Sequence, residues 1–422
     1  MSHTPESPRP AAHQLADHLF RHESGKMISI LVGSFGARHL QLAEDVVQES
    51  LIRALRSWPV HGIPEKPQAW LLKTARNLAI DQLRREKRFL EKQLELLAEL
   101  ERADHCDEVT DEAIDPQLSM IFVCCHPLIP PESQAALALK TLCGFSPAEI
   151  ANAFLVSEDA VTKRLTRARQ RIRESGLAFQ MPAVPEWPER LDGVLKVIYL
   201  LFNEGHKASQ GDEIVRAELC SEALRLAHLL TRHPAGNQPQ THALIALMAF
   251  TAARFPARVD ESGKLLRLED QNRGLWDQNL IHTGVTHLAL ASVGSELSDY
   301  HLQAGIAACH TLARSDATTD WQRILISYDL LLERQASPIV ALNRAVAISK
   351  VDGPDAALQA IDHSGIRQRL GNYHLFHAVL GELEVARGCP SAAAQHFREA
   401  LSSVETTPER AHLEARLKSC IE

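Results

Sequence analysis

Apolar residues recur at three- and four-residue spacing along most of this 422-residue chain, and stretches that alternate with a period of two are few. A period near 3.6 residues lines up apolar side chains on one face of a helix, whereas a half-buried strand needs a period of two. Glycine and proline interrupt the pattern at the intervals expected of helix hairpins. The sequence therefore predicts an all-α fold, and a length of about two to three ordinary domains predicts more than one domain.

Charge is divided unevenly along the chain. The net charge of −8 argues weakly against a nucleic-acid binder, yet residues 1–90 carry +4, residues 91–115 carry −8, residues 116–182 carry +2 and residues 183–422 carry −6. Prolines at 182, 185 and 188 interrupt any helix and mark a further boundary. We therefore expect a disordered tail at 1–11, a basic module at 12–90, an acidic linker at 91–115, a second basic module at 116–181 and a helical extension at 182–422.

Two classes of protein are excluded by composition. No apolar run approaches the roughly 20 residues of a membrane helix, and the polar start of the chain lacks a signal-peptide core. The eight cysteines are scattered and include no CxxC pair, so a secreted disulfide framework is not expected. We expect a cytoplasmic protein with reduced thiols and no membrane partner.

The strongest local signal is a helix-turn-helix at residues 146–175. Ser146 is followed by Pro147 and, three residues after the serine, by Glu149, which together form a capping box with the favoured proline at the first helical position. A turn near Val156 leads to Ser157, the expected cap of a second helix. Two capped helices joined by a short turn are typical of a DNA-reading module.

The second helix combines an apolar stripe with a basic face. Val161, Leu165, Ala168 and Ile172 are spaced for one face, and no acidic residue lies between positions 161 and 173. Such a helix suits the major groove, where lysine and arginine neutralise phosphates or reach guanine edges. The alternative is a solvated basic face on an ordinary helix hairpin. The residues that we expect to contact DNA are Thr162, Lys163, Arg164 and Arg167.

The N-terminal module carries a longer pattern. Residues 43–55 read AEDVVQESLIRAL, a loop with proline and glycine follows at 59–67, and residues 69–86 read AWLLKTARNLAIDQLRRE. This phrase resembles region 2 of an extracytoplasmic-function RNA polymerase sigma factor, and the helix-turn-helix stands where region 4 follows in that family. The resemblance covers roughly residues 12–178.

The resemblance implies roles for particular residues. The face with Asp45, Gln48 and Glu49 is similar to the surface that grips core RNA polymerase; its alternative is a solvated helix face. The residues that match positions facing the −10 promoter element are Arg76, Asn77, Asp81, Arg84 and Arg85. Short polar side chains bond base edges, and arginine tracks phosphate or stacks on bases. In this family the loop accepts a flipped base, and Trp58 and Trp70 are either stacking residues or, more commonly, core.

The acidic linker and the extension are less specific. The linker is either a flexible tether or, as the resemblance implies, a strand that occupies a nucleic-acid channel of the polymerase. In the extension, Leu380-Gly381, Ala393, Phe397 and Ala400 follow tetratricopeptide spacing, and a weaker unit lies 36 residues upstream. Stacked repeats of this kind leave a groove for a protein partner.

No enzyme motif accompanies these features. Dispersed histidines such as His228 and His287, and the run Cys124-Cys125-His126, lack metal-ligand spacing, so we expect no cofactor, no metal and no catalysis. The sequence predicts a sigma factor that binds core RNA polymerase and promoter DNA and is modulated by its extension. The alternative is a helix-turn-helix regulator with a partner-binding tetratricopeptide domain that does not act through polymerase.

Overall fold

The computed structural model describes residues 8–89, 115–154, 156–177, 179, 182–206, 217–260, 265–404 and 406–421. Within these ranges every regular element is a helix, apart from an isolated antiparallel bridge between Val259 and Leu265. The predicted all-α fold is confirmed. The chain forms two compact units, Met1–Leu201 and Phe202–Glu422.

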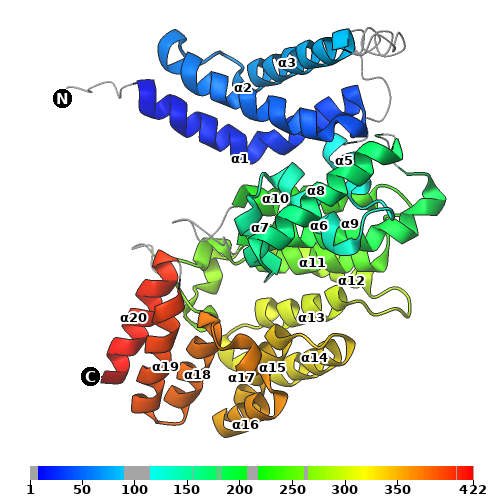
Figure 1. The fold of residues 1–422 in the computed structure, drawn as a ribbon. Helices are drawn as coiled ribbons and strands as arrows, with labels where there is room; N and C mark the ends of the chain where they lie inside the picture. Colours follow the sequence, from blue (N-terminus) through cyan, green and yellow to red (C-terminus); the bar gives the residue numbers. More distant parts are fainter. Residues whose placement is uncertain are drawn as a thin grey trace. The chain divides into compact units, whose positions relative to one another are not determined.

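Unit 1 holds both basic modules (Figure 1). In the first module, α1 packs on α2 and α2 on α3; in the second, α6 packs on α5, α7 and α8. The helices of this unit are α1 (Pro8–Phe35), η1 (Ala37–His39), α2 (Leu40–His61), α3 (Pro67–Phe89), α5 (Pro116–Cys124), α6 (Pro131–Cys143), α7 (Pro147–Phe154), α8 (Glu158–Ser175), η2 (Val184–Glu186) and the first part of α9 (Trp187–His206).

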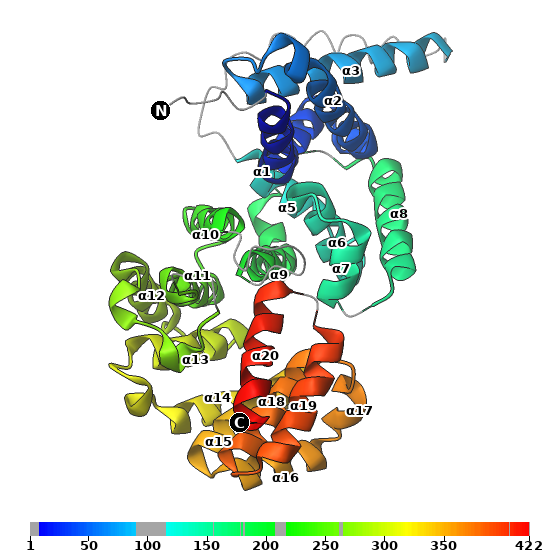
Figure 2. The ribbon, with the colours of Figure 1, turned by 90° about the vertical axis from the view of Figure 1, so that its left-hand side faces the viewer.

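Unit 2 is a run of antiparallel helix pairs (Figure 2). Its helices are α10 (Ala217–Thr231), α11 (Pro239–Ala252), α12 (Gln278–Ala291), α13 (Asp299–Leu312), α14 (Trp321–Arg334), α15 (Pro338–Val351), α16 (Pro354–Ser364), α17 (Ile366–Leu370), α18 (His374–Ala386), α19 (Pro390–Ser403) and α20 (Thr407–Ile421), with short 3₁₀ turns at η3 (Phe255–Ala257), η4 (Leu268–Asp270), η5 (Arg273–Leu275) and η6 (Asp316–Thr318).

Two of the expected boundary segments adjoin described helices. Helix α1 begins at Pro8, so the end of the expected tail is helical; proline is tolerated in a first helical turn because it lacks only an N–H that has no partner there. Most of the acidic linker lies outside the described residues. Its last residue, Asp115, caps α5 by accepting hydrogen bonds from the backbone N–H groups of Gln117 and Leu118 at 2.9 and 3.2 Å.

The expected boundary at the prolines differs from the observed one, which falls inside α9 after Leu201. The reason is packing. Trp187 is buried against Phe122, with ring centroids 4.6 Å apart, and Gly193 lies so close to Cys125 that an added Cβ would stand 3.3 Å from its sulfur. The prolines interrupt the helix, but the apolar start of α9 still belongs to the core of unit 1.

Glycine allows close helix contacts in unit 2. A Cβ at Gly381 on α18 would lie 2.6 Å from the ring of Phe397 on α19, and a Cβ at Gly284 on α12 would lie 2.6 Å from the ring of Phe250 on α11. Phe397 is fully buried together with Ala393 and Ala400. The contact of α18 with α19 is the close packing that the repeat spacing predicts at this pair. The assignment to the tetratricopeptide class itself stays a prediction.

Candidate nucleic-acid interface

The helix-turn-helix has the predicted caps. The Ser146 N–H donates to Glu149 Oε2 at 2.7 Å, and the Glu149 N–H donates to Ser146 Oγ at 3.2 Å, which completes the capping box of α7. Ser157 Oγ accepts from the Ala160 N–H at 3.3 Å at the start of α8. Gly176, with a φ of 63°, ends α8 in the left-handed region that favours glycine. These caps fix where α8 begins and ends, and therefore which side chains it presents.

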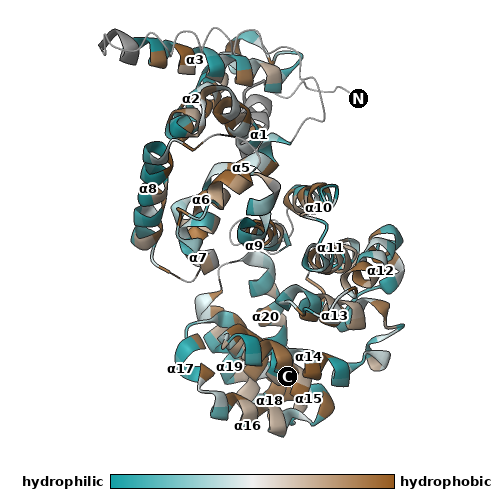
Figure 3. Ribbon diagram, turned by 90° about the vertical axis from the view of Figure 1, so that its right-hand side faces the viewer, coloured by the Kyte–Doolittle hydropathy of each residue, from teal (hydrophilic) through white to brown (hydrophobic). Residues whose placement is uncertain are grey.

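Helix α8 buries one stripe and exposes the rest. The buried residues are Val161, Leu165, Ala168 and Ile172, as the spacing predicts. Helices α6 and α7 lie against this stripe, and α8 flanks them in Figure 2. In Figure 3 the ribbon of α8 is drawn largely in the hydrophilic colour. Of the four residues expected to contact DNA, Thr162, Lys163 and Arg167 are exposed and Arg164 is half-buried.

Several cations of α8 already have partners. Lys163 Nζ lies 2.6 Å from Asp159 Oδ2, but both side chains are well exposed, so this pair contributes little to stability and exchanges easily for a phosphate. Arg171 Nη1 donates to the Leu128 carbonyl at 2.7 Å, and Arg169 Nη2 lies 2.9 Å from Glu44 Oε2. Arg171 therefore holds the module together, while the half of α8 nearer its N-terminus faces solvent.

Helix α3, like α8, buries one apolar face and exposes the other. Leu71, Ala75, Ala79 and Leu83 are all buried, at a strict four-residue spacing. The residues expected to face the −10 element lie on the remaining surface, where Asn77, Asp81, Arg84 and Arg85 are exposed and Arg76 is half-buried. The structure therefore brings the exposed members of this predicted set together on one helix.

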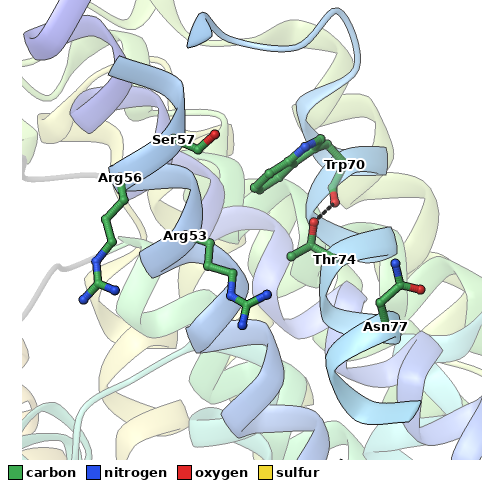
Figure 4. Close-up of a pocket in the computed structure, with 6 residues that line it drawn as sticks. All are labelled: Arg53, Arg56, Ser57, Trp70, Thr74 and Asn77. Carbon is green, nitrogen blue, oxygen red and sulfur yellow. Dashed lines mark hydrogen bonds between the residues drawn. The ribbon is translucent and has the colours of Figure 1, made fainter. Parts of the chain in front are cut away.

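A pocket of about 530 Å³ lies between α2 and α3 (Figure 4). The residues that line it are Arg53, Arg56 and Ser57 from α2 and Trp70, Thr74 and Asn77 from α3. Trp70 points across the gap toward α2, and its carbonyl accepts a hydrogen bond from Thr74 Oγ1 at 2.7 Å. The pocket thus combines two cations, an aromatic face and small polar groups, which together suit a base with its phosphate.

Sequence reasoning did not assign this pocket. Arg53, Arg56 and Ser57 follow i, i+3, i+4 spacing, and Trp70, Thr74 and Asn77 follow i, i+4, i+7 spacing, so each triplet shares one helix face. These two spacings are the sequence pattern from which the pocket could have been predicted. Of the two tryptophans, Trp58 is core, at 2% exposure, and Trp70 lines the pocket; their rings meet edge-on with centroids 5.6 Å apart.

The loop between α2 and α3 is shorter than predicted. Helix α2 continues through Pro59 to His61, although Pro59 has no N–H to donate to the carbonyl of Leu55 one turn earlier. Gly62, with a φ of 86°, then ends the helix, and its N–H donates to the Trp58 carbonyl at 3.0 Å. The chain between the helices therefore covers only residues 62–66.

The face expected to contact polymerase lies on α2. Asp45 and Gln48 are exposed, and Glu49 is half-buried. Asp45 Oδ1 accepts from Gln41 Nε2 at 2.9 Å, and Glu49 pairs with Arg53 at 3.1 Å. The opposite face of α2 is buried, so these acidic groups can face only solvent or a partner.

Comparison with known families assigns both modules. Residues 19–89 match the family Sigma-70 region 2, and residues 119–172 match the family Sigma-70, region 4. The ECF RNA polymerase sigma factor SigL of Mycobacterium tuberculosis is 30% identical over 133 residues, which are 31% of this chain and 72% of that protein. The chain belongs to the extracytoplasmic-function RNA polymerase sigma factors. Members of this family are non-enzymatic initiation factors that bind core RNA polymerase and promoter DNA.

Other similarities extend over more of this sigma factor. An uncharacterized protein of Rhizobium meliloti (strain 1021) is 40% identical over 391 residues, 90% of each chain. The ECF RNA polymerase sigma factor SigE of Mycolicibacterium smegmatis is 29% identical over 160 residues, and the alignment spans 60% of that protein. Residues 190–292 match a family of unknown function, DUF6596. No solved structure matches the chain.

Three thiols of region 4 lie in its core. Cys124, Cys125 and Cys143 are buried, and burial is the main cause that raises the pKa of the Cys124 and Cys125 thiols well above the ordinary value. A protonated thiol is a poor metal ligand and nucleophile. In the parts of the chain that the structure describes, no three His, Cys, Asp or Glu residues are arranged to hold a metal ion.

The extension brings three histidines together. His242 Nδ1 lies 2.9 Å from His287 Nδ1, its Nε2 lies 2.7 Å from Asn237 Oδ1, and the ring of His228 meets that of His287 at 5.1 Å. Burial first, and then the neighbouring His228 and His242, lowers the pKa of His287 to about 4. His287 is therefore neutral near pH 7. Among the described helices, none combines the length and apolarity that crossing a bilayer needs.

Proposed function

We propose that region 2 of this sigma factor reads and helps to melt the −10 element through α3. Asn77 and Asp81 offer short polar groups for base edges, and Arg84 and Arg85 offer cations for the phosphate backbone. The single observation that carries this proposal is the exposed face of α3 that ends in the pocket of Figure 4. Its volume of about 530 Å³ is within the usual range for a small ligand, so we propose that it accepts a base flipped from the melted strand.

Region 4 reads the −35 element in this proposal. Thr162, Lys163, Arg164 and Arg167 occupy the N-terminal half of α8, which is the half of a recognition helix that normally enters the major groove. Three of these four side chains are exposed, and the ion pair of Lys163 with Asp159 is easily exchanged. The caps at Ser157 and Gly176 support a rigid helix for this role.

Core RNA polymerase binds, in this proposal, to the α2 face with Asp45, Gln48 and Glu49. The acidic character of this face suits a basic partner surface, and its side chains have only local partners. Because polymerase is a cytoplasmic assembly, the sigma factor acts in the cytoplasm.

The extension modulates this activity. Its paired helices and the close contact at Gly381 support a repeat surface that binds a protein partner. The sign of the modulation follows from removing unit 2 and measuring transcription: a gain means restraint, and a loss means a required scaffold. Since the start of α9 packs on unit 1, the shortened chain must end after Leu201 and not at the prolines.

The competing function is a helix-turn-helix regulator that never directs polymerase. The test compares the affinity of the intact chain for promoter DNA alone and together with core polymerase. A sigma factor gains tight, sequence-specific binding only with polymerase, because the −10 element must be melted for recognition. Tight binding to duplex DNA by the chain alone, with no gain from polymerase, would support the regulator instead.

A further inference from the structure

Four buried nitrogen atoms without a hydrogen-bond partner gather in one part of unit 2. Among the described residues, these atoms are Arg254 Nε, Arg273 Nη2, Trp276 Nε1 and His310 Nδ1. A buried polar atom in a native protein is almost always hydrogen-bonded to protein, to ordered water or to a ligand. The arginine and tryptophan nitrogens always carry a proton, so what they lack is an acceptor.

Arg273 joins two of the segments that carry these atoms. Its Nη1 donates to the carbonyl oxygens of His310 and Ala313 at the C-terminal end of α13, at 2.8 and 2.9 Å. Its guanidinium carbon lies 4.5 Å from the ring centre of Trp276, a residue that is only 3% exposed. The guanidinium is therefore held between a helix end and an aromatic ring, and its Nη2 is left for another partner.

Arg254 reaches the same place from the end of α11. The carbonyl oxygen of Ala253, the residue before it, accepts a hydrogen bond from the Asp277 N–H at 2.9 Å, so Arg254 lies beside the start of α12. Helices α11 and α13 pack side by side (Figures 1 and 2), and Thr311 Oγ1 on α13 lies 3.5 Å from the Phe250 carbonyl oxygen on α11. The end of α11 is therefore close to the end of α13.

The charges that act on Arg254 are positive. Among the described residues, its side chain makes no hydrogen bond or ion pair. Burial, followed by the cations of Arg258 and Arg273, lowers the pKa of Arg254 to about 10, so the guanidinium is still charged near pH 7. A sheltered cation without a counter-ion is unfavourable unless an anion offsets it.

His310 completes the cluster as an uncharged group. Burial, followed by the cation of Arg254, lowers the pKa of His310 to about 4, so the ring is neutral near pH 7. Its Nδ1 carries the proton in one of the two neutral tautomers and can then donate. The carboxylate of Asp316 also acts on His310, but its Oδ2 already lies 3.8 Å from Lys350 Nζ. The cluster therefore keeps an excess of positive charge.

These donors suit a tetrahedral oxyanion better than a carboxylate. A carboxylate is bound best by two nitrogens of one guanidinium, and Arg273 cannot offer that fork because its Nη1 is engaged with carbonyl oxygens. Single donors from separate segments match the separate oxygens of a phosphate group, which also carries more negative charge near pH 7. Arg254, Arg273 and His310 are half-buried, so a small molecule can reach them.

We propose that Arg254, Arg273 and His310 form a binding site in the extension for a small phosphate-bearing molecule. The phosphate oxygens accept hydrogen bonds from the unpartnered nitrogens and offset the charge of the two guanidinium groups. All three residues belong to unit 2, so the site does not rest on the function proposed for the DNA-reading helices. A ligand that binds only the folded state stabilises it, so the concentration of this ligand acts on the extension.

The first test is Arg254→Met in the intact chain, followed by thermal unfolding in chloride and in inorganic phosphate at equal ionic strength. Phosphate should raise the unfolding temperature of the unmodified chain and of the control Arg398→Met, an exposed arginine on α19. Arg254→Met should lose this rise. In chloride, Arg254→Met should unfold about 2–4 °C above the unmodified chain, because methionine removes a sheltered cation that has no partner.

The second test is calorimetric titration with inorganic phosphate and with adenosine 5′-monophosphate. Arg254→Met and His310→Phe should each weaken phosphate binding about tenfold, since each removes a donor to a charged group. Phenylalanine keeps the ring that meets Trp321 with centroids 5.1 Å apart. Tighter binding of the nucleotide than of phosphate would support a ligand with an organic part, and equal binding would support free phosphate.

Each of three results would overturn the proposal. Phosphate may leave the unfolding temperature where chloride leaves it, or it may raise that of Arg254→Met as much as that of the unmodified chain; in both cases these residues bind no phosphate. If Arg254→Met unfolds at a lower temperature in chloride, Arg254 stabilises the fold and is not kept for a ligand. None of these results involves transcription, so the proposed function is tested separately.

Discussion

Helices α3 and α8 are built alike but differ in how they are held in the free chain. Each buries an apolar stripe and turns a polar, largely basic face outward. On α3, within the described residues, the side chains of Asn77, Asp81, Arg84 and Arg85 make no hydrogen bond or ion pair. On α8, by contrast, Lys163, Arg169 and Arg171 all have partners, and one of these partners is Glu44 in the other module.

The difference assigns separate tasks to the two helices. The reading face of α3 is ready for DNA as it stands. On α8 the cations proposed for DNA are Lys163, Arg164 and Arg167, and among these described side chains only Lys163 has an ion-pair partner. The partnered Arg169 and Arg171 lie further along the helix.

The largest effect should follow from reversing charge on α3. The double change Arg84→Glu and Arg85→Glu replaces two cations with two negative charges, which the phosphate backbone repels. Transcription by core polymerase with this variant should fall about a hundredfold. The control is Lys196→Glu on α9, an exposed lysine of the same unit away from either reading face. An equal loss with the control would show that general charge, not α3, decides binding.

A smaller loss is expected from the same reversal on α8. Lys163→Glu with Arg164→Glu should lower transcription about tenfold on promoters with a −35 element, because region 4 adds affinity but does not melt DNA. Promoters whose −35 element has been replaced should respond less. Normal transcription with both charges reversed would mean that α8 is not the recognition helix.

Free and engaged cations on α8 should differ in salt dependence. Each phosphate contact adds about −0.9 to the log–log slope of affinity against salt. Arg167→Gln should make the slope of polymerase–promoter binding less steep by about that amount, whereas Arg171→Gln should leave it unchanged, since Arg171 bonds the Leu128 carbonyl. Equal slopes for both variants would contradict the proposal that Arg167 contacts phosphate and Arg171 does not.

A change confined to unit 2 should leave the contacts of α3 and α8 unchanged, because both helices lie in unit 1. Burial, with His228 and His242 nearby, lowers the pKa of His287 to about 4 in the folded chain, below the ordinary value near 6.5. As pH falls from about 6.5 toward 4, the unfolded chain takes up the proton first, so stability is lost in that window. Thermal unfolding of the intact chain should show this loss, and His287→Gln should reduce it. His282→Gln, an exposed histidine on the same helix, should not.

Local features of the fold were predictable from the sequence because they depend on neighbours in the chain. The capping box at Ser146 and Glu149 and the buried stripe of α8 follow from spacing alone. The pocket between α2 and α3 needs two helix faces to meet, which spacing on either helix does not specify. Gly25 was visible as a glycine inside a helical pattern, but its contact with Leu142 joins residues more than a hundred positions apart. The partner of Glu44 is equally distant.

The domain boundary illustrates the same limit. Prolines at 182, 185 and 188 mark a break in secondary structure, and a break of that kind is local. Whether the following helix belongs to the earlier or the later core depends on tertiary packing, here that of Trp187 on Phe122. A sequence pattern predicts where a helix begins and ends. It predicts less well in which hydrophobic core that helix is buried.

The most direct test of the central claim is transcription in vitro by core polymerase supplied with the intact chain and a set of candidate promoters. We predict transcripts with defined start sites that require the −10 element and are strengthened by the −35 element, and that are lost with Arg84→Glu and Arg85→Glu but retained with Lys196→Glu. If no promoter in the set gives a start-site-specific transcript, or if the transcripts do not depend on the added chain, this sigma factor does not act as proposed.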